Sequence, residues 1–153
     1  MLKQVITCVN SKRNARDLHF GDVVSCVRIP NMPGSRYGND YAVMDWATEN
    51  RDSIFLCESF VSRRTDSYRE GYFKINTMHF VTGYPLFVCR NSIWQWVMPK
   101  SVRIGDLLMN DKLETVEVVS HEYITERAQS SDLKVCMFDS FFMNGILVHN
   151  KVD

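Results

Sequence analysis

The sequence lacks the cysteine and histidine pairs that hold metal ions. Its 153 residues include four histidines and five cysteines. No Cys-x-x-Cys motif or Cys/His cluster occurs, so the pattern predicts neither a metal site nor a cofactor. An odd number of separated cysteines also argues against a complete disulfide framework. We expect reduced thiols that pack as small core residues. The cysteines are Cys8, Cys26, Cys57, Cys89 and Cys136.

The chain also lacks a membrane-spanning segment and an excess of charge of either sign. No apolar run reaches the roughly 18 residues that a membrane helix needs, and the first residues do not resemble a secretion signal. Lys plus Arg and Asp plus Glu both number 18. Balanced charge does not attract nucleic acid or anionic lipid, so we expect neither as a partner. Because neither a membrane span nor a secretion signal is found, we expect a location in the cytoplasm.

Motifs of the common enzyme classes are absent as well. The sequence has no Gly-x-Ser-x-Gly, P-loop, His-Glu-x-x-His or Gly-x-Gly-x-x-Gly motif. Each of these motifs places a nucleophile, a phosphate, a zinc ion or a dinucleotide at a defined turn. The sequence therefore does not indicate a hydrolase, nucleotide-binding enzyme or zinc protease of those types.

What the chain does contain is a series of short β-rich runs with turn residues between them. Their number and spacing predict one all-β domain, a sandwich or barrel, with little helix. Helix is expected only in short turns before Gly21 and Gly105 and over 125–130. The expected strands span 23–29, 41–46, 54–61, 72–75, 86–89, 93–97, 116–119 and 135–138.

Trp94 and Trp96 alternate at strand spacing, which places both rings on one face of a sheet. Core packing is the interpretation that we favour. The alternative is an exposed aromatic face that binds another protein.

The strongest local signal lies near the end of the chain. Asn144-Gly145 separates two apolar runs, and this dipeptide favours a type I′ turn because both of its residues need positive φ. The sequence therefore predicts a hairpin over 138–150. His149 and Asn150 follow its second strand directly.

A second signal is an internal repeat. Gly21-Asp22 and Gly105-Asp106 lie 84 residues apart, and each pair has an apolar residue three positions before the glycine, another just before it and two aliphatic residues after it. A glycine allows a tight turn, and an aspartate side chain can bond the turn backbone. The repeat favours a pseudo-duplicated β domain over two unrelated turns.

These two features resemble the hedgehog/intein (Hint) family. In that family a hydrophobic hairpin delivers a penultimate histidine and a final asparagine to a self-processing centre, and two intertwined β subdomains each carry a Gly-Asp turn. The resemblance implies a single Hint-like domain of pseudo-twofold symmetry over 1–153. Residues at about 29–69 match no motif and are expected to be an insertion or elaboration that carries contacts of its own.

Several positions depart from the family pattern. Where the family has Thr-x-x-His-Pro, this chain has Tyr84 before Pro85, and Thr82 in the threonine position leaves the motif one residue short. A tyrosine of ordinary pKa is a poor general base at neutral pH. His79 is a candidate replacement, although a hydrogen-bonding histidine is the reading that we favour.

The first nucleophile and the splicing acceptor are also missing from their family positions. Members that splice begin with Cys or Ser, and here Met1 lies 20 residues before Gly21, close to the family spacing. Cys8 is an alternative nucleophile, but its position favours a buried thiol in the first strand. Lys151 follows Asn150 in place of the Cys, Ser or Thr that splicing requires.

The resemblance therefore implies a non-splicing, non-enzymatic structural or adaptor protein that binds other protein chains and can be a homo-oligomer. The ending Asn-Gly-x-x-Val-His-Asn-Lys is similar to degenerate Hint domains of tailed-phage structural proteins, which implies a virion component. The main alternative is self-processing, in which Asn150 cyclises and His149 protonates the leaving amine. A third possibility is a β module that binds a peptide or small molecule.

Overall fold

Strands dominate the computed structural model, which describes residues 1–33 and 40–152. The helical segments within those residues are α1 (Asp40–Asp45) and the single turns η1 (Ala15–Asp17) and η3 (Pro99–Ser101). The prediction of a mainly β domain is confirmed. The strands are β1 (Val5–Cys8), β2 (Ser11–Asn14), β3 (Val23–Arg28), β4 (Ala47–Thr48), β5 (Phe55–Arg69), β6 (Tyr72–Ile75), β7 (Met78–Phe80), β8 (Leu86–Arg90), β9 (Ile93–Val97), β10 (Leu107–Met109), β11 (Thr115–Glu117), β12 (His121–Ile124), β13 (Ala128–Val135), β14 (Ser140–Met143) and β15 (Ile146–His149).

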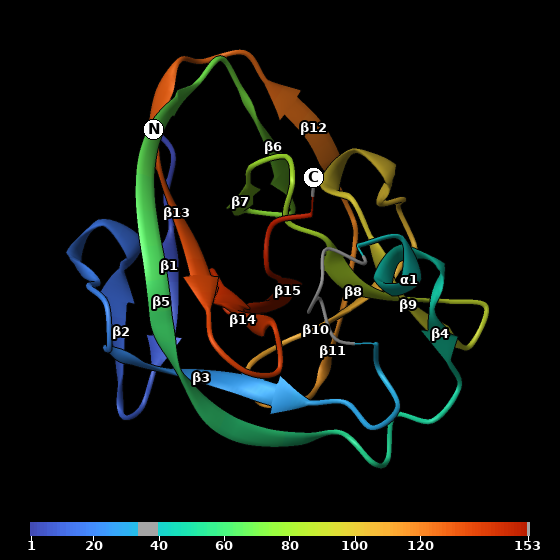
Figure 1. Ribbon diagram of the computed structural model, residues 1–153. Helices are drawn as coiled ribbons and strands as arrows, with labels where there is room; N and C mark the ends of the chain where they lie inside the picture. The colour runs from blue at the N-terminus through green and yellow to red at the C-terminus, as the bar shows by residue number, and fades with distance from the viewer. Residues whose placement is uncertain (34–39, 153) are drawn as a thin grey trace.

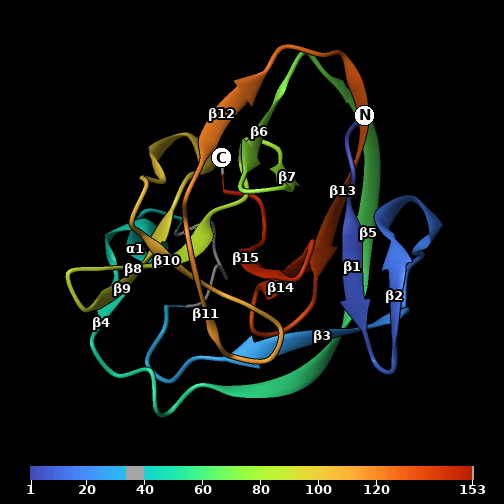
Figure 2. The ribbon, with the colours of Figure 1, turned by 180° about the vertical axis from the view of Figure 1, so that it is seen from behind.

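Most strands join one antiparallel sheet whose order runs β11-β10-β8-β15-β14-β1-β3-β5-β13. β2 pairs with β1, β9 pairs with β8, and β4 pairs with β9. A separate sheet has the order β12-β6-β7. The long strands β5 and β13 run beside β1 along one side of the molecule, and the terminal hairpin lies between that side and β8 (Figures 1 and 2). The terminal hairpin therefore lies between β1, from the start of the chain, and β8, from its middle.

The terminal hairpin β14–β15 lies in the middle of the main sheet. Every residue of both strands is buried. Phe141 and Val148 contribute to one hydrophobic cluster, and Phe142 and Leu147 contribute to another. Because neighbouring residues of a strand point to opposite faces, the hairpin separates two cores and is covered on both sides.

Both tryptophans of β9 pack in the second of these clusters, with 3% of Trp94 and 2% of Trp96 exposed. Phe87 of β8 stacks on Trp94 at 5.0 Å between ring centroids and lies 4.8 Å from Trp96. The prediction that these rings form core is confirmed, and they offer no exposed aromatic face.

Three local predictions were wrong, each because tertiary contacts decide a short ambiguous run. Residues 41–46 were expected to be a strand, but they lie mostly in α1, whose Val43 is fully buried in the second cluster. Residues 125–130 were expected to be helical, but β13 begins at Ala128 and pairs with β5. The strand expected over 135–138 ends at Val135, and Met137, Phe138 and Asp139 have positive φ.

Residues 29–69 contribute a major strand to the fold. β5 pairs with β3 through Phe55 to Phe60 and with β13 through Val61 to Arg69. Part of this region, 34–39, lies outside the described residues. Its identification as an insertion that carries contacts of its own stays a prediction. No helix within the described ranges is long and apolar enough to cross a membrane.

Gly71 leaves room for Tyr123 where the β5–β6 connection passes β12. A Cβ atom on Gly71 would overlap the Tyr123 ring and lie 2.7 Å from the Ile124 carbonyl oxygen. We expect Gly71→Ala to lower the free energy of unfolding by about 2 kcal/mol, because a backbone atom cannot move aside as a flexible side chain can. Urea unfolding measures the loss. A combined Gly71→Ala, Tyr123→Ala variant that regains full stability would contradict this role of the Ile124 carbonyl.

Candidate functional site

The Asn-Gly turn closes the terminal hairpin and binds the start of the chain through hydrogen bonds. Asn144 and Gly145 have φ of 53° and 80°, as a type I′ turn requires. The Asn144 Oδ1 atom accepts from the Val5 amide at 3.0 Å, and its Nδ2 atom donates to the carbonyls of Lys3 at 2.9 Å and His79 at 2.8 Å. One side chain thus fastens the first strand, the hairpin and β7 together.

Asn150 lies at the exit of the hairpin, with 3% of the residue exposed. Its Oδ1 atom accepts from the Val135 amide at 3.0 Å, and its Nδ2 atom donates to the Val135 carbonyl at 2.9 Å. A longer contact of 3.4 Å joins Nδ2 to Asp139 Oδ1, and the Asn150 amide donates to the Asp139 carbonyl at 2.7 Å. The carboxamide therefore pairs with the end of β13 as a neighbouring strand would.

His149 is fully buried beside Asn150. Its Nδ1 atom donates to the Asn150 carbonyl oxygen at 2.8 Å, and its ring meets the edge of Trp96 at 5.1 Å between centroids. The His149 backbone amide donates to Pro85 at 2.8 Å. The imidazole thus contacts the carbonyl of the peptide bond that joins Asn150 to Lys151, and can polarise it.

The residues after Asn150 continue as packed structure. The Val152 amide donates to the Gly83 carbonyl at 2.8 Å, and the Val152 side chain is buried. Gly83 has a φ of 99°, and the Lys151 Cγ atom lies 3.1 Å from the place that a Cβ on that glycine would take. The peptide bond after Asn150 is therefore held on both sides.

Tyr84 and Thr82 lie on the segment that faces this end of the chain. Tyr84 is buried, and its hydroxyl donates to the Leu133 carbonyl at 3.3 Å. Burial, with the charge of Asp132, raises the pKa of Tyr84 well above its ordinary value. Tyr84 is therefore a neutral core side chain that cannot serve as a base. Thr82 is exposed, and its catalytic role stays a prediction.

His79 lies beside the N-terminal segment. Its Nδ1 atom accepts from the Lys3 amide at 2.9 Å, and its ring packs 4.8 Å from that of Tyr72. Burial, followed by nearby positive charges including that of Lys3, lowers the pKa of His79. The ring is neutral near pH 7 and acts as a hydrogen-bond acceptor that orders the start of β1. A catalytic role for it stays a prediction.

Cys8 ends β1 as a buried thiol. Its Sγ atom lies 3.7 Å from the Ile6 carbonyl oxygen, and burial raises the pKa of this thiol. A raised pKa leaves little thiolate at neutral pH, so the environment disfavours Cys8 as a nucleophile.

The two Gly-Asp turns have the same geometry. Gly21 and Gly105 have φ of 89° and 95°. Asp22 accepts from the His19 amide at 2.8 Å, and Asp106 accepts from the Arg103 amide at 2.7 Å. Each turn follows a single turn of 3-10 helix, η1 or η3. The backbones thus show the pseudo-twofold relation, with the aspartate closing each turn.

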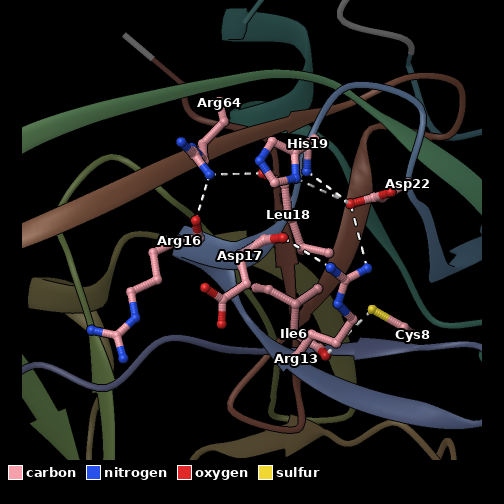
Figure 3. A network of polar contacts seen from close by, with 9 residues as sticks. All are labelled: Ile6, Cys8, Arg13, Arg16, Asp17, Leu18, His19, Asp22 and Arg64. Atoms are coloured by element: carbon pink, nitrogen blue, oxygen red, sulfur yellow. Dashed lines mark hydrogen bonds and ion pairs between the residues drawn. The ribbon is translucent and has the colours of Figure 1, made fainter.

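The first turn is braced by arginines at its surface (Figure 3). Arg64 donates to the Leu18 carbonyl at 2.9 Å and also to that of Arg16. Arg13 donates to the Asp17 carbonyl at 2.9 Å and reaches Asp22 at 3.4 Å. The Asp22 side chain is 31% exposed, so water competes for these contacts.

The second turn contains a buried ion pair. Arg90 Nε lies 2.8 Å from Asp106 Oδ1, and Arg90 Nη2 lies 2.7 Å from Oδ2. The Asp106 side chain is 4% exposed. Burial alone would raise the pKa of Asp106, but the hydrogen bonds from Arg90 and the Arg103 amide hold it below its ordinary value. Arg90 also lines an open cleft of about 450 Å³ beside this turn.

Sequence reasoning missed the partners that make this region one site. The backbone of Val135 and the carboxylate of Asp139 carry no motif signal. Val135 was expected to begin a strand over 135–138, and Asp139 was expected only as part of the hairpin over 138–150. Arg90 was also missed, because nothing in the sequence ties it to Asp106. Within the described part of the chain, no group of three His, Cys, Asp or Glu side chains could hold a metal ion.

Solved structures with a similar fold include inteins and an intein-like domain. The intein-like domain from Clostridium thermocellum is 15% identical, with a TM-score of 0.70 over 98% of this chain and 99% of that one. The gp41-1 intein is 14% identical, with a TM-score of 0.63 over 97% of this chain and 95% of that one. The DnaB intein from Synechocystis sp. PCC 6803 is 14% identical, with a TM-score of 0.65 over 98% and 96%.

No sequence-family profile matches the chain, and no curated protein does. At 14–15% identity the structural likeness establishes the fold alone. It extends over nearly the whole chain and includes the terminal hairpin. This protein therefore has the intein-like Hint fold.

Proposed function

We propose that this chain is a non-splicing module of the intein fold that serves as a structural or adaptor protein in a phage tail or capsid. The observation that carries the proposal is the capture of the Asn150 carboxamide by the Val135 backbone. Cyclisation requires the Asn150 Nδ2 atom to attack the carbon of its own carbonyl. Leaving Val135 would break both hydrogen bonds of a buried side chain and leave the Val135 backbone groups without those partners.

The positions that would activate the first peptide bond also favour a structural role. Tyr84 is buried and neutral, and its hydroxyl bonds the Leu133 carbonyl. His79 uses Nδ1 to accept from the Lys3 amide, a contact that orders the first strand. Both side chains thus make contacts that stabilise the fold.

Exposed apolar side chains at the two Gly-Asp turns support binding to other protein chains. Phe20 is 76% exposed and Val23 47% exposed at the first turn. Ile104 is 70% exposed and Val119 65% exposed at the second. Apolar surface of this kind is typical of protein interfaces when it is contiguous. The assignment to a virion rests on the resemblance of residues 144–151 to phage Hint endings.

Self-processing at Asn150 is the competing function, and one contact favours it. His149 Nδ1 donates to the Asn150 carbonyl oxygen at 2.8 Å, which would stabilise negative charge developing on that oxygen. In that reaction Nδ2 bonds to the carbonyl carbon and the bond to Lys151 breaks. The released amine takes a proton, and a succinimide remains on Asn150.

Native mass spectrometry of the purified chain after several days near neutral pH separates the two functions. We expect an uncut chain, because cyclisation would have to break the two hydrogen bonds between Asn150 and Val135. A species shortened by everything after Asn150 and ending in a succinimide would establish self-processing instead. An uncut chain whose native mass is that of an oligomer, or of a complex with an added virion protein, would support the structural role.

Asn150→Ala tests the same contacts through stability. We expect the free energy of unfolding to fall by about 2–3 kcal/mol, since the Val135 amide and carbonyl lose their partners in a buried site. Urea unfolding measures the loss. Gln129→Ala, on an exposed position of β13, is the matched control and should change stability by less than about 0.5 kcal/mol. A loss at Asn150 no larger than that control would contradict a structural role for the carboxamide.

A further inference from the structure

Two cysteines that are far apart in the sequence face each other on adjacent strands of the main sheet. Cys26 of β3 and Cys57 of β5 are direct register partners in an antiparallel pair. Their Sγ atoms lie 3.1 Å apart. We infer that this pair is an oxidation site, where a small-molecule disulfide such as oxidised glutathione converts the two thiols into a cross-strand disulfide.

The geometry needs little rearrangement of the backbone. Directly opposed residues of an antiparallel pair have Cα atoms roughly 4.5–5.5 Å apart, inside the usual disulfide range of about 4.4–6.8 Å. The two sulfur atoms must approach by about 1 Å to reach a bonded separation near 2.05 Å. Small rotations of the two side chains can supply that approach while the register of β3 and β5 is kept.

The two thiols differ in access, which sets the order of the reaction. Cys26 is fully buried, whereas Cys57 is half-buried next to the exposed side chains of Phe55 and Leu56. Burial, followed by the contact with Cys57, raises the pKa of the Cys26 thiol. A small oxidant therefore reaches Cys57 first, and Cys26 acts as the resolving thiol.

The exchange proceeds in two displacements. The Cys57 thiolate attacks one sulfur of oxidised glutathione, forms a mixed disulfide and releases one glutathione thiolate. The Cys26 thiolate then attacks Cys57 Sγ, which closes the protein disulfide and releases the second glutathione. The two protons lost by the cysteines are taken up by the two leaving thiolates. The cysteines lose two electrons and the glutathione disulfide gains them.

Such a bond would fasten the base of the segment that connects β3 to β5. The two cysteines are 31 residues apart, and α1 and β4 lie between them. Closing a loop of this length restricts the unfolded chain, and we expect the melting temperature to rise by about 5–10 °C. The protein would thus keep free thiols in a reducing cytoplasm and gain this link in an oxidising medium.

Peptide mapping after oxidation tests the site. The reduced chain is incubated with oxidised glutathione at mildly alkaline pH, free thiols are alkylated, and the digest is analysed by mass spectrometry. We expect Cys26 and Cys57 peptides joined by a disulfide, with the chain lighter by two hydrogen atoms and Cys8, Cys89 and Cys136 alkylated. The reaction should slow as pH falls, because both displacements need a thiolate.

Two variants keep the result interpretable. Cys57→Ser replaces a half-buried side chain, so it should fold and should abolish both the linked peptide and the rise in melting temperature. Cys89→Ser, at a second half-buried cysteine, should retain both. A stable glutathione adduct on Cys57 without closure, a disulfide to a different cysteine, or an unchanged melting temperature in the linked protein would overturn the inference. These outcomes are independent of whether the chain cleaves at Asn150.

Discussion

Replacing Asp106 by alanine is expected to lower the free energy of unfolding by about 3 kcal/mol, whereas Asp22→Ala should cost about 1 kcal/mol. The two aspartates close equivalent turns, so the difference between the two losses of unfolding free energy measures the effect of their surroundings. Asp106 is almost fully buried and accepts from Arg90 through both carboxylate oxygens. Its loss would leave the Arg90 charge and the Arg103 amide without this acceptor.

Asp22 makes the same backbone contact in a wetter place. Its contact with Arg13 is 3.4 Å long, and nearly a third of its side chain is exposed. Exposed ion pairs contribute about 0–1 kcal/mol because water and salt screen them. Urea unfolding of the two variants measures both losses, provided that the slope of unfolding free energy against urea concentration stays unchanged. Equal losses at the two turns would show that the buried pair adds nothing to the turn itself.

The Asp106 contribution should also depend on pH. Its folded-state pKa is depressed, so the stabilisation is present above the ordinary carboxyl pKa of about 3.9 and disappears as pH falls through the lower folded value. The difference in unfolding free energy between the parent chain and Asp106→Ala should therefore be constant near neutral pH. It should shrink below about pH 4. A difference that grew with acid would contradict the assignment.

Trp96→Ala is expected to cost about 3–5 kcal/mol, the range for truncating a buried aromatic residue. The ring is 2% exposed and packs against Phe87 and His149. Its Nε1 atom also donates to Met32 Sδ at 3.2 Å. Trp96→Phe keeps most of the packing and should lose less, about 1–2 kcal/mol. The measurement is again urea unfolding.

The Trp96→Ala variant also tests how the core holds His149 and Asn150. Removing the ring takes away the surface against which the His149 imidazole packs. Ile104→Ala, at a residue that is 70% exposed, is the control and should change stability by less than about 0.5 kcal/mol. Intact-mass analysis of both variants reports whether a looser His149 permits cleavage after Asn150. A loss for Trp96→Ala as small as that of the control would contradict the role of Trp96 in the core.

Local chemistry was readable from the sequence wherever a backbone conformation demands one residue type. Asn144-Gly145 has positive φ at both residues, and Gly21 and Gly105 also lie in the positive-φ region. β3, β6, β8 and β9 were predicted within one or two residues of their limits. The alternation of Trp94 and Trp96 correctly predicted that both rings face the core. These features depend on a few neighbouring residues, so they appear in the sequence.

Contacts between distant segments were not readable, because they depend on register and burial. Asn150 pairs with Val135, Arg90 binds Asp106, and Cys26 meets Cys57 only because β3 and β5 align in one register. The helix α1 and the long strand β13 also depend on what they pack against. The sequence by itself determined the turns, the strand-rich class and the terminal His149-Asn150 pair. The tertiary structure decided that this pair is buried. There the Asn150 carboxamide bonds the Val135 backbone at the end of β13, and the His149 imidazole bonds the Asn150 carbonyl, in place of bonds to water.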